Sequence, residues 1–201
     1  MKIGIFPGSF NPVHVGHLAI ANYMAEYGEL DEIWFLITPK SPHKGRNELI
    51  DQNLRLSLLK RAIGDYPKFK ICTLEWEMPQ PTYTINTLQK LRILYPEYSF
   101  NLIIGSDNWV NFHRWKDYQT ILKNFKVLIY PRLSSGKIVF NNPNVSMVKN
   151  APKIEISSSF IRESIKNGKD VRFFLPDGMY SELKENDFFT KIEDSTEKEK
   201  E

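Results

Sequence analysis

Short apolar runs, separated by longer and partly polar segments, repeat along most of the chain. They have the length and composition of buried strands and cover residues 2–6, 31–37, 69–74, 99–104 and 125–130, with a shorter candidate at 145–148. Strands that alternate with helices favour a parallel sheet covered by helices on both faces, which is a Rossmann-like, doubly wound α/β fold. We expect one domain over residues 1–184, followed by a charged tail, residues 185–201, that buries little and is flexible.

The segments between the apolar runs carry signals for helix starts and ends. Asp51 is placed to cap a helix that extends to Ile63. The apolar stripe of that helix would consist of Leu54, Leu58, Leu59 and Ala62. Pro176 fits the first position of a last helix, which ends near Leu183. Further helices are expected within residues 14–27, 82–92, 117–122 and 156–168.

Composition and charge exclude several classes of protein. The chain has 201 residues, of which 41% are hydrophobic and 25% charged, as is ordinary for a soluble globular protein. A net charge of +3 is too small to indicate a nucleic-acid partner, and no apolar run approaches the length of a membrane span. The N-terminus shows no signal peptide, so we expect the cytoplasm. Cys72 is the single cysteine, and its strand-like surroundings favour a buried structural thiol over a catalytic one.

The stretch that holds most candidate chemistry covers residues 4–17. A loop rich in Gly, Pro, Ser and Asn follows the first strand and opens a helix that we expect to carry both His14 and His17. The loop lets the backbone approach a ligand, and the helix N-terminus offers N–H groups and a favourable dipole to an anion. Two histidines three positions apart share one helix face, and Gly16 leaves space between them. This pattern predicts a nucleotide phosphate site.

Other chemistries fit this stretch less well. His14 and His17 have a spacing that zinc ligands can have, but further ligands are not evident in the sequence. Three common motifs are missing from the sequence. They are the dinucleotide-binding G-x-G-x-x-G, the P-loop G-x-x-x-x-G-K-[ST] and the nucleophile elbow G-x-S-x-G of α/β-hydrolases. In parallel sheets ligands bind beyond the carboxyl ends of the strands, where this chain has unusual loops after the first, second, fourth and fifth strands.

Two segments resemble the signatures of one superfamily. Residues 8–17, Gly-Ser-Phe-Asn-Pro-Val-His-Val-Gly-His, resemble the G-[ST]-F-[DN]-P-x-H-x-G-H signature of the nucleotidyltransferases that include bacterial adenylyltransferases and class I aminoacyl-tRNA synthetases. Residues 156–162, Ile-Ser-Ser-Ser-Phe-Ile-Arg, are similar to the second signature, I-S-S-T-x-I-R. Ser159 stands where threonine is usual, and both residues supply a hydroxyl.

Four further segments narrow the resemblance to the nicotinate-nucleotide adenylyltransferases. They are Pro42-His-Lys44, Thr82-Tyr-Thr84, Gly105-Ser-Asp107 followed by Trp115, and Phe174-Leu-Pro176. The resemblance implies transfer of the adenylyl group of ATP to nicotinate mononucleotide, which gives deamido-NAD and pyrophosphate. It also implies Mg²⁺ that arrives with ATP rather than in a carboxylate cage of the protein. Association of identical chains is left open.

The resemblance assigns roles to residues of three groups. Catalytic roles fall to His14, His17, Lys44 and Arg162, with His43 as a further candidate beside Lys44. ATP contacts fall to Gly8, Ser9, Phe10, Gly105, Asp107, Ile156, Ser157 and Ser158. Contacts to the nicotinate nucleotide fall to Asn11, Thr84, Trp115 and Arg132. Thr84 and backbone N–H groups would hold the ring carboxylate, and Trp115 would stack on the pyridine ring.

Some roles and acceptors stay open at the level of sequence. Trp109 and Trp115 could both be core aromatics, and Arg132 could equally be an ordinary surface charge. Glu75 is expected to orient a loop rather than to act in acid–base catalysis. A phosphopantetheine acceptor is disfavoured by Thr84 and Trp115, whereas nicotinamide mononucleotide is harder to exclude. A non-catalytic nucleotide-binding protein of the same fold is the alternative outside enzymes. RNA recognition is disfavoured by the small net charge.

Overall fold

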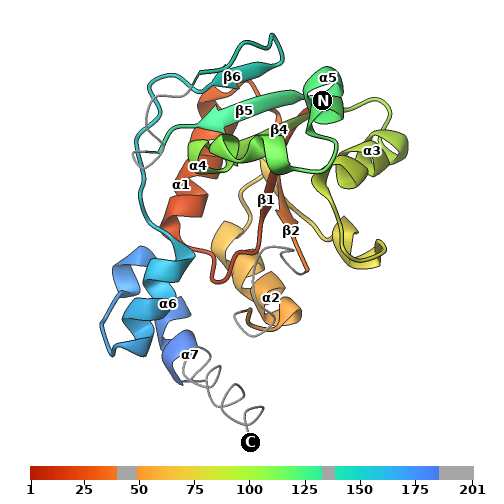
Figure 1. The fold of residues 1–201 in the computed structure, drawn as a ribbon. Coiled ribbons are helices and arrows are strands. Elements are labelled where there is room, and N and C mark those ends of the chain that lie inside the picture. Colours follow the sequence, from red (N-terminus) through yellow and green to blue (C-terminus); the bar gives the residue numbers. More distant parts are fainter. Residues whose placement is uncertain (40–48, 133–138, 186–201) are drawn as a thin grey trace, which may run out of the picture. The chain divides into compact units, whose positions relative to one another are not determined.

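The computed structural model describes residues 1–39, 49–132 and 139–185 (Figure 1). They form two compact units. The first unit takes residues 1–8, 19–38 and 65–155, and the second takes residues 9–18, 39–64 and those from 156 onward. Since residues 186–201 lie outside the described part of the chain, the flexible tail and the domain boundary at residue 184 stay predictions.

The first unit contains the sheet. Within the described residues six strands form one parallel sheet in the order β3-β2-β1-β4-β5-β6. They are β1 (Lys2–Gly8), β2 (Glu32–Ile37), β3 (Phe69–Cys72), β4 (Ser99–Gly105), β5 (Lys126–Tyr130) and β6 (Val145–Met147). At the carboxyl edge Gly8 pairs with Ile37, and Gly105 pairs with Tyr130. The loops that carry the predicted site residues therefore leave the sheet at one edge.

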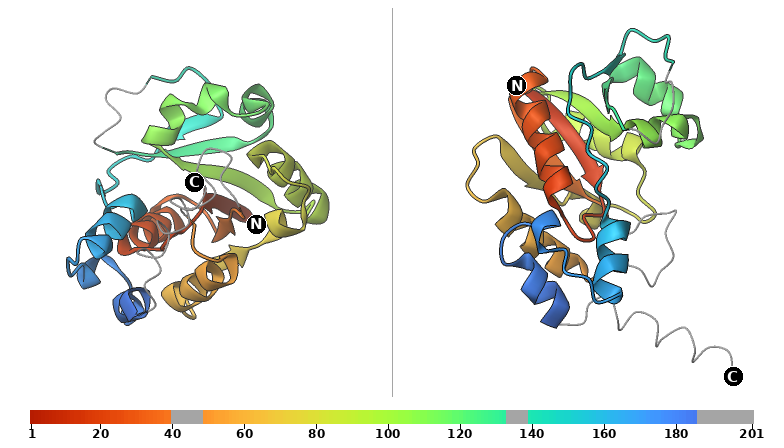
Figure 2. Two further views of the ribbon diagram at one scale, coloured as in Figure 1. Left: turned by 60° about the horizontal axis from the view of Figure 1, so that its bottom comes forward. Right: turned by 90° about the vertical axis from the view of Figure 1, so that its left-hand side faces the viewer.

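Helices cover both faces of this sheet. The first unit holds α3 (Thr84–Leu94), α4 (Ser106–Val110), α5 (Tyr118–Asn124), and the short 3₁₀ helices η1 (Leu74–Glu77) and η2 (Phe112–Arg114). Helix α1 (Val15–Tyr27) enters the first unit at residue 19, and Figure 2 shows it across the sheet from α3. The predicted doubly wound parallel sheet is confirmed. None of the described helices combines the length and the apolar character needed to cross a membrane.

One face of the sheet forms a continuous core with α3, η2 and α5. Alternate strand positions and helical positions three or four apart bring its members together. They include Ile3, Ile5, Cys72, Ile85, Leu88, Leu91, Phe100, Leu102, Ile104, Phe112, Ile121, Val127 and Ile129. Burial raises the pKa of the Cys72 thiol, which keeps it protonated at neutral pH. The cysteine is thus buried in the core, as predicted.

The second unit holds α2 (Gln52–Ile63), α6 (Ser158–Lys166), η4 (Arg172–Phe174) and α7 (Met179–Glu185). Asp51 caps α2 as predicted, because its Oδ1 accepts from the N–H groups of Asn53 and Leu54 at 2.8 and 3.2 Å. The predicted start of α7 at Pro176 is wrong. The Pro176 carbonyl accepts from the Met179 N–H in a turn, and Gly178 takes a left-handed φ of 69°, which a helix does not allow.

Candidate active site

The two signature segments lie side by side in the second unit. The Ser158 hydroxyl donates to the Pro12 carbonyl at 2.9 Å, and Arg162 Nη1 donates to the Asn11 carbonyl at 3.0 Å. These bonds join residues that are 146 and 151 positions apart in the chain. The structure therefore brings together the loop before α1 and the start of α6, which the sequence assigned to one phosphate site.

The histidine pair lies where that loop enters α1. The prediction that the helix carries both histidines is wrong for His14, which precedes α1 and whose carbonyl accepts from the N–H groups of His17 and Leu18. The two rings stack, with centroids 3.7 Å apart and planes 28° apart. His17 Nδ1 accepts from the backbone N–H of His14 at 3.3 Å. A ring nitrogen that accepts carries no proton, so the proton of neutral His17 lies on Nε2.

The loop holds a backbone conformation that its own residues do not favour. Phe10 has a φ of 45°, in the left-handed region, at a cost of about 1–3 kcal/mol for a residue other than glycine. Its side chain is buried and meets the His17 ring edge-on, with centroids 5.1 Å apart. Packing of Phe10 thus offsets part of the strain and sets the position of His17.

Arg55 holds the same loop from α2, a role that the sequence pattern did not indicate. Its side chain is 1% exposed. Its three guanidinium nitrogens donate to three backbone carbonyls: Nε to Ile50 at 3.2 Å, Nη1 to Ser9 at 2.8 Å and Nη2 to Pro39 at 3.0 Å. Burial lowers the pKa of the guanidinium, and the charge of Asp51 opposes this. The available signal was a cation directly beside Leu54, inside the apolar stripe of α2.

Asn11 connects the loop to the entrance of α2. Its Oδ1 accepts from the Ile50 N–H at 3.1 Å, and its side chain is 1% exposed. Since Ile50 also accepts from Arg55, the two buried side chains hold one backbone segment between them. The amide oxygen of Asn11 is engaged within the protein, and its predicted contact with the mononucleotide stays a prediction.

At the start of α6 the serines serve two structural purposes. Ser157 is the N-cap, with Oγ accepting from the Phe160 N–H at 3.2 Å. Ser159 Oγ accepts from Arg162 Nη2 at 3.3 Å, while half-buried Ile156 leads into the cap. The capped end of α6 is the positive end of its dipole, which favours an anion. The phosphate contacts expected of Ser157, Ser158 and Arg162 stay predictions.

In the first unit, Gly105, Asp107 and Arg132 gather at the ends of β4 and β5. The Arg132 N–H donates to Ser106 Oγ at 2.7 Å, and Arg132 Nη1 lies 3.9 Å from Asp107 Oδ2. A Cβ at Gly105 would stand only 2.2 Å from Asp107 Oδ1, so glycine is what lets this carboxylate fold back over the strand end. Arg132 is therefore an ion-pair partner of Asp107 rather than an isolated surface charge.

Thr84 and Trp115, which are predicted to contact the nicotinate nucleotide, belong to neighbouring segments of the first unit. Thr84 opens α3, and Trp115 follows η2 with its ring 5.1 Å from that of Phe112. Lys116 Nζ lies 4.6 Å from the centre of the Tyr83 ring, a cation–π contact that joins the two segments. Within the described residues Tyr83 caps α3 without a side-chain hydrogen bond to the N–H groups of the first turn.

Beneath that helix start lies Glu75, which is 2% exposed. Its Oε1 accepts from the Thr87 hydroxyl at 2.7 Å and its Oε2 from the Thr82 hydroxyl at 3.1 Å. Burial raises the pKa of the Glu75 carboxyl, and the two hydroxyl bonds oppose this. The geometry agrees with the predicted role of Glu75 in orienting a loop.

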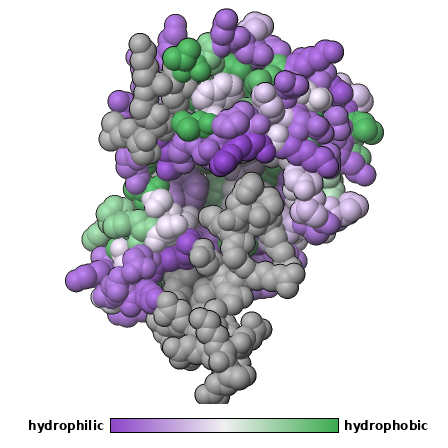
Figure 3. Space-filling view, in the orientation of Figure 1, coloured by the Kyte–Doolittle hydropathy of each residue, from purple (hydrophilic) through white to green (hydrophobic). Residues whose placement is uncertain are grey.

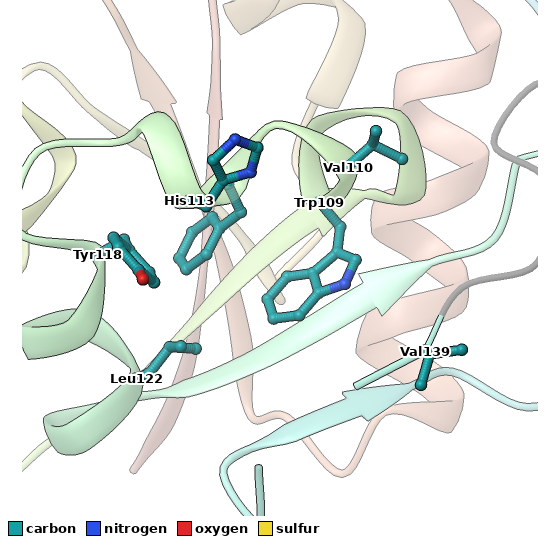
Figure 4. Close-up of a pocket in the computed structure, with 7 residues that line it drawn as sticks. Trp109, Val110, His113, Tyr118, Leu122 and Val139 are labelled. Atoms are coloured by element: carbon teal, nitrogen blue, oxygen red, sulfur yellow. The ribbon is translucent and has the colours of Figure 1, made fainter. Parts of the chain in front are cut away.

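A separate hollow of about 350 Å³ opens beside η2 and α5 (Figure 4). The described residues that line it are Trp109, Val110, Phe112, His113, Tyr118, Leu122 and Val139. Trp109 is half-buried and stacks on Phe112 here, with centroids 5.2 Å apart, so it packs against the core from the side of the hollow. The aromatic lining suits an apolar group better than a phosphate, and none of the predicted site residues is among these described lining residues.

Two predicted residues, Lys44 and His43, lie outside the described residues, so their positions stay predictions. Among the residues that the structure does describe, no group of three or more His, Cys, Asp or Glu side chains could hold a metal ion.

Comparison with known protein families agrees with the signature segments. The family model of cytidylyltransferase-like proteins matches residues 5–164. A probable nicotinate-nucleotide adenylyltransferase of Azobacteroides pseudotrichonymphae genomovar. CFP2 is 60% identical over 94% of this chain and 99% of the relative. A probable nicotinate-nucleotide adenylyltransferase of Bacteroides fragilis (strain YCH46) is 47% identical over 90% of each chain.

Solved structures agree in fold. Plasmodium falciparum nicotinic acid mononucleotide adenylyltransferase complexed with NaAD superposes with a TM-score of 0.77 at 21% identity, over 94% of this chain and 97% of that one. A putative nicotinate-nucleotide adenylyltransferase from Vibrio parahaemolyticus gives a TM-score of 0.68 at 22% identity, over 92% of this chain and 99% of that one. At such low identity these likenesses establish the shared fold.

Proposed function

Because the chain belongs to the cytidylyltransferase-like family and within it to the nicotinate-nucleotide adenylyltransferases, we propose that it joins nicotinate mononucleotide to ATP. The products are deamido-NAD and pyrophosphate. The contact between the two signature segments, Ser158 to Pro12 and Arg162 to Asn11, is the observation that carries the proposal. It places a histidine pair and a helix N-terminus in one unit, as binding of a polyphosphate requires.

In this reaction a phosphate oxygen of the mononucleotide attacks the α-phosphorus of ATP. A new P–O bond forms, the bond between the α-phosphorus and the bridging oxygen breaks, and pyrophosphate leaves with that electron pair. The attacking phosphate is already an anion, so a strong base is unnecessary. The protein must align two polyanions and stabilise the charge of the transition state, which hydrogen-bond donors and cations do best.

The described residues supply such donors. His17 would donate its Nε2–H to the α-phosphate, held in that tautomer by the bond from His14 to Nδ1. Ser157, Ser158 and Arg162 would meet the β- and γ-phosphates at the start of α6. Lys44, outside the described residues, is the further cation predicted for the phosphates. Mg²⁺ would neutralise the polyphosphate as the metal partner of ATP, which suits an ion that prefers substrate phosphates and water to a protein cage.

Adenosine and the acceptor would be bound by residues of the first unit. Gly105 and Asp107 would meet the adenosine, with the carboxylate on the ribose hydroxyls and Arg132 as its partner. Thr84 and the first-turn N–H groups of α3 would hold the nicotinate carboxylate, and Trp115 would stack on the pyridine ring. From the second unit, Ser9, Phe10 and Ile156 would contact ATP together with Gly8, and His14 would meet the ATP phosphates. Asn11 and Arg132 would contact the nicotinate nucleotide.

The described residues include several large exposed apolar side chains. Figure 3 shows a mostly hydrophilic face with small apolar patches, and large exposed apolar side chains such as Ile93, Val139 and Phe173 lie far apart in the sequence. Scattered exposed apolar residues are normal on a soluble protein. Association of identical chains and the cytoplasmic location stay predictions.

A panel of acceptors tests the proposed function. The purified full chain is given ATP, Mg²⁺ and nicotinate mononucleotide, nicotinamide mononucleotide or phosphopantetheine, and pyrophosphate release is measured. We expect the highest kcat/KM with nicotinate mononucleotide. Faster turnover with phosphopantetheine would overturn the choice of acceptor, and no turnover with any of the three would favour a non-catalytic nucleotide-binding protein.

A further inference from the structure

The buried carboxylate of Glu75 joins two points of the chain that lie on either side of the α3 start. Thr82, in the preceding turn, bonds to one of its oxygens, and Thr87, in the helix itself, bonds to the other. All three side chains are at least 93% buried. We call this arrangement the Glu75 staple.

The staple encloses the segment that the proposed function gives to the acceptor. Between its two anchors lie Tyr83, which is the N-cap, and Thr84, the first residue of α3. The Tyr83 carbonyl accepts from the N–H groups of Asn86 and Thr87 at 2.9 and 3.2 Å, which closes the first turn. The Glu75 carbonyl also accepts from Gln80 Nε2 at 2.9 Å, so the backbone of the same residue secures the preceding loop.

We propose that Glu75 is a positioning residue that sets the preference of this enzyme for a nicotinate over a nicotinamide acceptor. The inference rests on the proposed function and deepens it. Glu75 touches neither substrate, and it acts through Thr82 and Thr87 by fixing the direction in which Thr84 and the first-turn N–H groups point. The staple is the juxtaposition of one buried carboxylate with two buried hydroxyls.

The physical reason lies in the small difference between the two acceptors. Nicotinate presents two acceptor oxygens, whereas nicotinamide presents one acceptor oxygen and one NH₂ donor. Two fixed N–H donors satisfy the carboxylate, but one of them meets a donor when the carboxamide binds, and a buried unpaired group is costly. The enzyme can distinguish nicotinate from nicotinamide only while these donors are held in place. In a loose turn a donor could move aside, and the site would then bind either acceptor.

A Glu75 carboxylate that faced the ligand would bind nicotinate less well. If Glu75 faced the ligand directly, its negative charge would repel the nicotinate carboxylate. Here both carboxylate oxygens are engaged by hydroxyls, and burial opposes ionisation, which raises the pKa of the carboxyl. The staple therefore orients the turn while its charge is kept from an anionic ligand.

The test compares Glu75→Gln, Thr82→Val and Thr87→Val with the wild-type chain. Each change removes or reverses one bond of the staple with little change of shape. We expect the ratio of kcat/KM for nicotinate mononucleotide to that for nicotinamide mononucleotide to fall about tenfold, the effect of about 1.4 kcal/mol. The fall should come from a higher KM for the nicotinate acceptor, while the KM for ATP changes less than about twofold.

Glu77→Gln is the matched control, since Glu77 belongs to the same 3₁₀ helix and is exposed. It should leave the acceptor ratio unchanged. Circular dichroism and thermal melting select the variants that fold, and the two threonine variants keep the test decisive if Glu75→Gln does not. An unchanged ratio in folded staple variants would overturn the inference, as would equal changes in both KM values. Failure of the proposed function would appear earlier, as a wild-type chain that does not use nicotinate mononucleotide.

Discussion

The loop after β1 and the turn before α3 are each held by one buried charged side chain, and the two charges have opposite signs. Arg55 donates to three backbone carbonyls around the first, whereas Glu75 accepts from two threonine hydroxyls around the second. A cation suits a loop that is proposed to bind polyphosphate, because its charge adds to the attraction of anions. A carboxylate beside a proposed carboxylate site must instead be shielded, and its two hydroxyl bonds do this.

The two regions would respond differently to loss of the charged side chain that holds them. The partners of Arg55 are the backbone carbonyls of Ser9, Pro39 and Ile50, so without the guanidinium these carbonyls would lose their hydrogen-bond donor. The partners of Glu75 are side chains that can be altered one at a time. We therefore expect changes in the first region to affect stability and catalysis, and changes in the second to affect the choice of acceptor.

His17→Ala should give the largest effect. It removes the Nε2–H proposed to stabilise the transition state, and loss of one such donor lowers kcat by about 10²–10³-fold. His113→Ala is the control, because His113 is exposed and lines the aromatic hollow. Steady-state pyrophosphate release measures both variants. A folded His17→Ala chain with kcat within threefold of wild type would remove His17 from the chemistry.

Arg55→Met should lower the free energy of unfolding by about 3–5 kcal/mol, since buried carbonyls lose a charged donor. Urea denaturation measures the change. Arg61→Met is the matched control on the same helix, where a half-exposed arginine pairs with Glu182 and should contribute less than about 1 kcal/mol. Similar losses in the two variants would contradict the role of Arg55 as the anchor of the loop.

Trp115→Leu should raise the KM for nicotinate mononucleotide about tenfold, through loss of stacking worth about 1–3 kcal/mol, with little change in the KM for ATP. Trp109→Leu is its counterpart, because half-buried Trp109 also packs on the buried ring of Phe112 and no ligand contact is predicted for it. That variant should melt at a lower temperature with an unchanged acceptor KM. An equal rise in acceptor KM in both variants would show that Trp115 acts only through packing.

The pH dependence of stability should show the smallest effect. The pKa of Glu75 is raised in the folded chain, so its contribution to stability is present below the ordinary glutamate pKa and is lost as the pH rises through the folded pKa. The neighbouring Cys72 thiol stays neutral in this range. The stability advantage of wild type over Glu75→Gln should thus shrink between pH 4 and pH 8, by about 1.4 kcal/mol per unit of pKa difference. An advantage that grows with pH would show the opposite shift.

Much of this arrangement could be predicted from local signals. Alternating apolar runs indicate the parallel sheet, Asp51 indicates the cap of α2, and the two signatures indicate segments that do meet. Arg55 could not be predicted in the same way, because its place in the apolar stripe of α2 does not reveal the backbone carbonyls of Ser9 and Pro39, which lie far away in the sequence. The predicted helix start at Pro176 was wrong because Gly178 takes a left-handed conformation, which delays the start of α7 to Met179.

The bonds from Ser158 to Pro12 and from Arg162 to Asn11 also bear on the order in which the chain folds during synthesis. They close loops of 146 and 151 residues, and such long-range contacts form only after the entropy of closing the loop has been lost. The ribosome releases the loop before α1 long before it releases α6. The nascent loop therefore gains its bonds to Ser158 and Arg162 only after α6 has emerged, and a chain truncated before residue 158 would keep only the earlier anchors from Arg55 and Ile50.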